Sequence, residues 1–361
     1  MELIISIFLV FLGFFFKNKI ISKIQLFWIW ILISFNNGGP DYDGYESIFI
    51  ESARKLQFNF FKPGVLYSNG AYIFHKIGLN LEVYTIITSS IALFFLCRIV
   101  KKYSKNPNFV YSCFIVFPLV DNIIQKRNFL SMIPILLSID LLIEKKKCYI
   151  VKSFILIIIA FNFHVLGIIY LVYIIVPFFS LKNIKKISLV ILTIGLILMP
   201  ILDEVAKILF RFASSRVELY FFDISMRLPF YKASCFVIIH LLMFCYVIFS
   251  VKFKNKKDTF DKTLLKINYV FLFAIPLYFY DSTFLRIYRN IFILNYILIG
   301  NYIYERKNSI NRKIIRVFFI LFIILLFLFM YALLGQLKYS GLVLPLFNNN
   351  IVLNFFREVI F

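Results

Sequence analysis

Long apolar stretches separated by short polar segments run through nearly the whole chain. A stretch such as "LVILTIGLILMP" covers much of the length that a helix needs to cross a bilayer. The polar segments between the stretches alternate between strongly basic and less basic. This pattern predicts an all-α polytopic integral membrane protein, with residues 1–361 in a single transmembrane domain.

About twelve spans fit the pattern. They are expected near residues 2–16, 20–35, 82–100, 107–120, 128–143, 150–163, 165–180, 187–202, 232–251, 267–281, 287–304 and 314–334. Several are shorter than the ~20 residues that a perpendicular helix needs. Tilted ends, interfacial aromatics or a re-entrant hairpin at 150–180 would account for the short ones.

Six basic hinges hold more than half of the 40 Lys and Arg residues, and they set the orientation. They lie at 17–23, 98–105, 145–152, 182–186, 252–266 and 306–316. Cytoplasmic loops carry such an excess of Lys and Arg, so we expect the hinges inside and both termini outside. The long external loops are then 36–81 and 203–231. The net charge of +22 is therefore mostly an orientation signal, and we expect no nucleic-acid partner.

Composition agrees with the membrane class and narrows the chemistry. Hydrophobic residues make up 61% of the chain and charged residues 16%, against about 25% charged in soluble domains. The five Cys show no C-x-x-C spacing, and there are only three His. No Walker A, G-x-G-x-x-G, H-E-x-x-H or G-x-S-x-G motif occurs. We therefore expect no metal and no cofactor.

Polar groups gather at four places on the predicted outer side. These are the acidic loop "GGPDYDGYESIF", the turn "VDNIIQKRNF", the hairpin "AFNFHVLG" and the segment "YDSTFLRIYRNIF". They contain Asp41, Tyr42, Tyr45, Gln125, Arg127, His164, Arg286 and Arg289. Ionisable residues at the ends of membrane spans mark function by default, and one outward-facing site would explain all four.

Each of these residues also has a simpler interpretation. Asp41 after Pro40 suits an Asx-turn, and Arg127 suits a snorkelling anchor at a helix end. His164 suits an ordinary turn histidine, and Arg286 with Arg289 suits the rim of the membrane interface. Together they fit an anionic, oxygen-rich ligand that arrives from outside.

The order of several short motifs resembles a known family. "DYDGY" is followed by "KPGVLYSNGAYIFHKIGLN", a basic hinge "LCRIVKKYSKNP", a Q-x-R turn, the lysine-rich "IEKKKCYIVK" and "NFH". Over about residues 36–180 this order resembles the EpsG-like branch of the Wzy-type polysaccharide polymerases. The chain departs from the family pattern at "SFNNGGP", which lacks an arginine before the glycine. It also departs at Lys62, where an acidic residue is frequent, and at Asn128, where a small residue or Gln is common.

The resemblance implies a glycosyltransferase with a GT-C-like architecture in the bacterial inner membrane, its site facing the periplasm or cell exterior. The substrates would be a donor and an acceptor oligosaccharide, each linked to undecaprenyl diphosphate. Asp41 is the first candidate for the base and His164 the second, and Arg127, Arg286 and Arg289 would hold the diphosphate. The remaining substrate-binding candidates are Tyr42, Tyr45, Gln125, Arg211, Arg216 and Arg227.

Four other functions are the alternatives. A flippase or transporter of lipid-linked oligosaccharides would use cations along a path across the bilayer. Another polyprenyl-linked glycosyltransferase or a surface-polymer ligase would use almost the same groups. A structural subunit of an export complex would not need the external polar groups. Besides membrane lipids, the partners expected of a polymerase are a flippase and a chain-length regulator.

Overall fold

The computed structural model describes residues 2–199, 228–305, 310–333 and 338–360. Throughout these residues the regular structure is helical, and one isolated bridge joins Asn36 and Asn350. The all-helical prediction is therefore confirmed for this part of the chain. The chain divides into two compact units, Met1–Leu171 with Tyr296–Phe361 and Val172–Asn295, here called the first and second unit.

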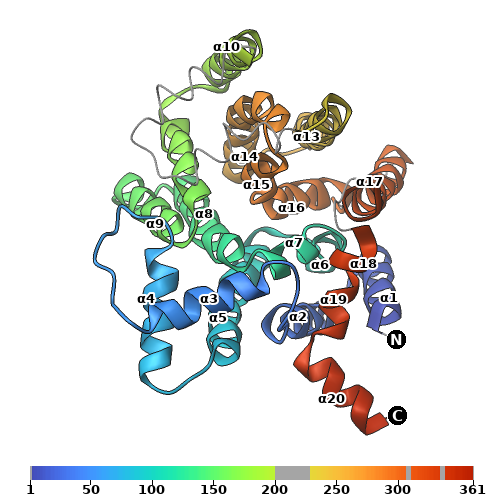
Figure 1. The fold of residues 1–361 in the computed structure, drawn as a ribbon. Helices are drawn as coiled ribbons and strands as arrows, with labels where there is room; N and C mark the ends of the chain where they lie inside the picture. The colour runs from blue at the N-terminus through green and yellow to red at the C-terminus, as the bar shows by residue number, and fades with distance from the viewer. Residues whose placement is uncertain (1, 200–227, 306–309, 334–337, 361) are drawn as a thin grey trace. The chain divides into compact units, whose positions relative to one another are not determined.

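The first unit contains most of the helices (Figure 1). The first four are α1 (Glu2–Phe15), α2 (Lys19–Ser34), α3 (Tyr42–Ser52) and α4 (Val65–Lys76), and the last two of these lie within the predicted external loop 36–81. Next come α5 (Leu81–Tyr103), α6 (Pro107–Val116), α7 (Leu119–Ile124), α8 (Lys126–Glu144) and α9 (Tyr149–Phe163). After the second unit follow most of α16 (Phe292–Ile303), α17 (Ile310–Leu328), a π segment (Phe329–Leu333), α18 (Lys338–Leu342), α19 (Leu344–Asn348) and α20 (Ile351–Ile360).

The second unit is built on three longer helices and several short ones. The longer helices are α10 (Leu181–Leu198), α13 (Phe230–Phe253) and α14 (Thr259–Val270). Short 3₁₀ turns follow at Phe271–Ala274, Pro276–Phe279 and Ser282–Phe284, and then α15 (Leu285–Arg289). A 3₁₀ segment, Val165–Phe178, begins in the first unit and ends in the second.

Four of the described helical segments are long and apolar enough to cross a membrane. They are Leu81–Tyr103, Phe230–Phe253, Thr259–Phe279 and Ile310–Leu333. Shorter apolar helices of 10–17 residues accompany them. The chain is thus a membrane protein by length and composition of its helices, while the number of about twelve spans and the GT-C-like architecture stay predictions.

The predicted span 107–120 is interrupted. Helix α6 ends at Val116, and α7 begins at Leu119, after Pro118. Proline has no N–H and clashes with the preceding turn, so it ends the helix there. The hydroxyl of Tyr296 donates a hydrogen bond to the Phe117 carbonyl (2.9 Å), an acceptor that the broken helix leaves without an intrahelical partner. The predicted turn "VDNIIQKRNF" is consequently helical up to Ile124, and helix resumes at Lys126.

Polar side chains hold α1, α2 and α6 close together. Gln25 on α2 donates to the Leu9 carbonyl on α1 (3.0 Å) and to the Ser112 hydroxyl on α6 (2.8 Å). Gly13 faces the Gln25 side-chain nitrogen and the Ser112 hydroxyl, and a Cβ there would lie 2.1 Å from each. A small residue at this position allows the backbones to approach, as is common between membrane helices.

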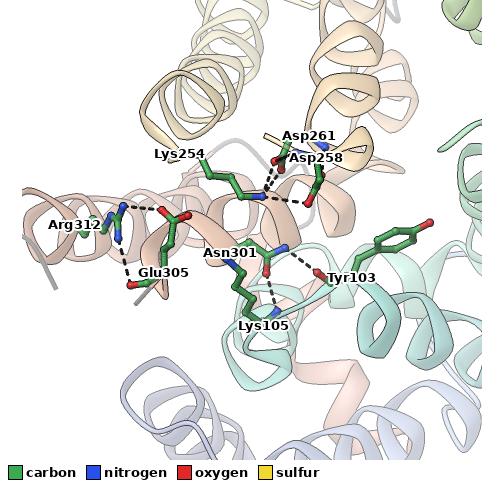
Figure 2. Close-up of polar contacts among 8 residues, drawn as sticks. All are labelled: Tyr103, Lys105, Lys254, Asp258, Asp261, Asn301, Glu305 and Arg312. Atoms are coloured by element: carbon green, nitrogen blue, oxygen red, sulfur yellow. Dashed lines mark hydrogen bonds and ion pairs between the residues drawn. The ribbon is translucent and has the colours of Figure 1, made fainter. Parts of the chain in front are cut away.

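Basic hinges contain ordered ion pairs (Figure 2). In the second unit, Lys254 donates to both carboxylate oxygens of Asp261 at 2.7 and 2.6 Å, and the two side chains are 4% and 0% exposed. Asp261 also forms a capping box with Asp258 at the start of α14. In the first unit, Arg312 pairs with Glu305 at 2.6 Å. These pairs fix the helix ends on either side of two predicted cytoplasmic hinges.

Candidate functional site

The break between α7 and α8 presents the Q-x-R turn. The Gln125 N–H donates to the Asp121 carbonyl (2.8 Å), and the Gln125 carbonyl accepts from the Phe129 N–H (3.0 Å). The Asp121 carboxylate accepts a hydrogen bond from the Tyr331 hydroxyl (2.8 Å). Both sides of the break are therefore fixed, and α8 starts with two adjacent cations, Lys126 and Arg127.

Arg127 joins three segments that are far apart in the sequence. Its Nε donates to the carbonyl of Phe163, the residue before His164 (3.2 Å). Its guanidinium lies 5.9 Å from the centre of the Tyr67 ring on α4, a cation–π distance. It also packs on Gly64, which precedes α4. Helix α4 packs on α5 and on α9, and Figure 1 shows α4 next to α9, the helix that leads into the "NFH" motif.

Gly64 is the glycine of the Pro-Gly pair that opens the motif "KPGVLYSNGAYIFHKIGLN", and it contacts Arg127. Its φ is +85°, a region that side chains other than glycine rarely adopt. A Cβ at Gly64 would lie 2.0 Å from one terminal nitrogen of Arg127. The glycine is thus required both by the backbone turn into α4 and by the space that the guanidinium occupies.

The acidic loop continues into α3, which packs on α4. Asp41 is the N-cap residue of α3, its side chain makes no capping hydrogen bond, and it is exposed. Tyr45 is buried, with its ring 5.8 Å from that of Tyr67, so it holds α3 against α4. Tyr42 is half-buried, and the Lys126 ammonium lies 5.2 Å from its ring centre. The D-Y-x-x-Y motif therefore contacts Lys126 directly through Tyr42, whereas its Tyr45 packs on Tyr67, the ring over which Arg127 lies.

His164 is the C-cap residue that follows α9, and it is half-buried. Its Nδ1 accepts a hydrogen bond from the Leu166 N–H (3.3 Å). In the neutral imidazole this acceptor role at Nδ1 leaves the proton on Nε2. In that tautomer His164 offers a proton donor, which suits contact with a substrate oxygen better than proton abstraction.

Arg286 and Arg289 lie on α15 in the second unit, where Arg286 is half-buried and Arg289 is 3% exposed. Asp281, in the same predicted site segment, caps the preceding 3₁₀ turn through the Thr283 N–H. The helix is fixed by Tyr288, whose hydroxyl donates to the Asn268 side chain (2.6 Å) and whose ring stacks on His240 at 3.7 Å.

Three further candidates, Arg211, Arg216 and Arg227, lie outside the described residues. Conversely, the contacts of Arg127 add Gly64 and Tyr67, which the sequence analysis did not place in the site. Lys126, a residue of the predicted polar turn that was not a site candidate, joins them through its contact with Tyr42. The Pro-Gly pair before α4 signalled Gly64. The position next to Arg127 at the start of a helix, where a cation is unfavourable, signalled Lys126.

A family model described as the EpsG family matches residues 19–347. The chain belongs to the EpsG family. This match covers every candidate residue of the site, so the resemblance of residues 36–180 is confirmed and extends over α2 to α19. The EpsG family is associated with glycosyltransferase and polymerase activity in polysaccharide biosynthesis. Neither the curated proteins nor the solved structures gave a match.

Proposed function

We propose that this EpsG-family chain is a polysaccharide polymerase. It transfers a growing glycan from undecaprenyl diphosphate onto the terminal sugar hydroxyl of a lipid-linked repeat unit, at the outer face of the bacterial inner membrane. The observation that carries the proposal is the junction at Arg127, where the Pro-Gly, Q-x-R and "NFH" segments of the family pattern meet. A cation held by three segments suits a ligand whose charge must be located accurately.

The reaction needs a base and a fixed cation. The acceptor hydroxyl oxygen attacks the anomeric carbon of the donor glycan, and the bond from that carbon to the diphosphate oxygen breaks. Asp41, exposed at the start of α3, takes the hydroxyl proton, and undecaprenyl diphosphate leaves as the anion. Arg127 stabilises the charge that develops on the leaving diphosphate. His164 donates through Nε2 to a substrate oxygen.

The other candidate residues have supporting roles in this proposal. Arg286 and Arg289, one helical turn apart on α15, stay candidates for binding a diphosphate group in this proposal. Gln125 and Tyr42 contact the sugars, Tyr42 through its ring face. Tyr45 acts mainly by holding α3 in place because it is buried. Arg211, Arg216 and Arg227 cover the acceptor or its diphosphate.

A lipid-linked substrate also needs an apolar groove that binds its polyprenyl chain. The first unit contains a groove of ≈ 340 Å³ between α1, α6, α7, α17 and α19, lined by apolar side chains such as Val120, Ile123 and Leu346. The Leu346 carbonyl accepts from the Asn36 side chain (3.3 Å), and the Asn36 carbonyl accepts from Lys126 (2.9 Å). Two hydrogen bonds thus connect the groove to Lys126, the first cation of α8. An apolar groove followed by a cation suits a polyprenyl diphosphate, in which an apolar chain is followed by an anionic group.

The test is the polymer pattern of a deletion strain. A polymerase-deficient strain exports single repeat units, so a single repeat or a short oligosaccharide should replace the polymer ladder. An unchanged ladder, with redundancy excluded, would contradict the proposal. Loss of all exported repeat units would instead identify a flippase. A flippase and a chain-length regulator encoded beside the gene are the partners that the proposal expects.

A further inference from the structure

A buried ammonium group at the start of α8 has few partners. Lys126 is 7% exposed, and its Nζ donates one hydrogen bond, to the Asn36 carbonyl at 2.9 Å. Among the described residues no carboxylate oxygen lies within 4.0 Å of this nitrogen. An ammonium has three N–H donors, so two of them have no protein acceptor there. Buried charges are normally paired because leaving water costs several kcal/mol.

The position on the helix makes the charge more unusual. Lys126 and Arg127 are the first two residues of α8, which is 19 residues long. The N-terminal end of a helix carries a partial positive charge and unsatisfied N–H groups, so cations are disfavoured there. Two adjacent cations and the helix end therefore produce a positive potential that an anion would stabilise.

A second buried group lacks a partner at the same place. Tyr67 is 2% exposed, and its hydroxyl has no hydrogen-bond partner among the described residues. Tyr67 and Lys126 line one small cavity of ≈ 10 Å³, together with Thr85, Thr88 and Ser89. That volume holds about one oxygen atom, such as a water or a single phosphoryl oxygen. A buried hydroxyl without a partner is costly, so the cavity is chemically suited to an oxygen ligand.

We propose that Lys126 and the Tyr67 hydroxyl are further donors of the diphosphate site, beside Arg127. This rests on the proposed function for the identity of the ligand, a lipid diphosphate. One phosphoryl oxygen occupies the space between Lys126 and Tyr67, and Arg127 binds the remaining oxygens. Lys126 lies between Gln125 and Arg127, the two residues that define the Q-x-R turn.

The site has a proton-linked signature. Burial lowers the pKa of Lys126 to about 8, against a smaller opposing effect of Glu82 on α5. Of the groups that face it, Tyr42 on α3 and Tyr67 on α4 have pKa values raised by burial above their usual range, and Arg127 stays charged. Lys126 is thus charged below pH 8 and loses its charge above it. Anion binding above pH 8 then requires proton uptake, and affinity falls by up to about tenfold per pH unit.

The experiment measures binding to the purified full-length protein in nanodiscs. The probe is farnesyl diphospho-N-acetylglucosamine, because both of its phosphates are diesters and keep a constant charge between pH 6 and pH 9.5. Farnesol and inorganic pyrophosphate serve as comparison ligands. The variants are Lys126→Met and Tyr67→Phe, with Lys76→Met as the control, since Lys76 is an exposed lysine in the last turn of α4.

We expect Lys126→Met to weaken binding of the probe at least about tenfold at pH 7, Tyr67→Phe about threefold, and Lys76→Met not at all. The wild type should bind equally from pH 6 to pH 7.5 and progressively more weakly above pH 8, a dependence that Lys126→Met abolishes. Wild-type affinity that is constant up to pH 9.5 would overturn the inference even if the variants do not fold.

The comparison ligands separate the inference from the proposed function. Strong binding of the probe by the wild type and by Lys126→Met alike would overturn the role of Lys126 and leave the lipid-diphosphate site intact. Equally strong binding of pyrophosphate and of the probe would support an anion site and contradict a lipid-linked ligand. Binding of farnesol as strong as that of the probe would overturn the anion site itself.

Discussion

Replacing Gly64 by alanine tests whether the position of Arg127 matters for catalysis. The new Cβ would lie 2.0 Å from a terminal nitrogen of Arg127, whereas ordinary contacts start at 3.4 Å. The guanidinium must therefore move by about 1.4 Å. Because it is the far end of a flexible side chain, it can move at little cost in stability. A displacement of about 1 Å in a catalytic site can cost ~100-fold in rate. We expect Gly64→Ala to lose about 100-fold in polymer formation, measured as ladder intensity at matched membrane levels.

Gly78 provides the control because it lies just beyond the other end of α4. Its φ is +77°, close to the +85° of Gly64, and nothing lies within 4 Å of a Cβ there. Alanine at either glycine costs about 1–2 kcal/mol of backbone strain, so both variants should unfold at similar temperatures. Gly78→Ala should keep a near-wild-type ladder. Equal ladders from the two variants would refute the reasoning that Gly64 positions Arg127.

Three further predictions concern other residues. Arg127→Ala should lose ~30- to 1,000-fold in rate, or about 2–4 kcal/mol of transition-state stabilisation, and Arg127→Lys should stay clearly impaired because the planar donor fork is lost. The polymer ladders of both variants check this, and a near-neutral Arg127→Lys would indicate a simple interfacial anchor. In a cysteine-free background, Asp41→Cys should react with an impermeant thiol reagent in intact cells and Lys146→Cys only after permeabilisation; external labelling at 146 would reverse the topology. Lys254→Met should destabilise the protein by about 3–5 kcal/mol because it leaves the Asp261 carboxylate buried without its ion-pair partner, and adding Asp261→Leu should recover much of the loss. Unfolding temperatures test this, and a wild-type unfolding temperature for Lys254→Met would refute it.

The sequence predicted the helical class and the positions of most helices because apolar periodicity and basic hinges are local signals. Helices α5 and α13 agree with the predicted spans 82–100 and 232–251 within a few residues. The break at Pro118 was readable in principle, since proline ends a helix. The helices α3 and α4 within the loop 36–81 were not predicted, because their stability comes from packing of Tyr45 and Tyr67 rather than from a long apolar run.

The site was predicted in part for the same reason. Arg127 and His164 stood out as polar groups at span ends, and the structure brings Arg127 to the Phe163 carbonyl beside His164. Gly64 and Tyr67 could not be connected to Arg127 from the sequence, because the contact crosses about 60 residues and depends on how α4 packs. The roles of Asp41, Arg286 and Arg289 stay predictions, since no local pattern determines which charges share one ligand.

The central claim is tested most directly by reconstituting the purified protein in liposomes with lipid-linked repeat units isolated from the deletion strain. The account predicts glycans of increasing length, with one undecaprenyl diphosphate released per bond formed, and a loss of both products with Arg127→Ala. Repeat units that remain single, with no diphosphate released by the wild-type protein, would contradict it.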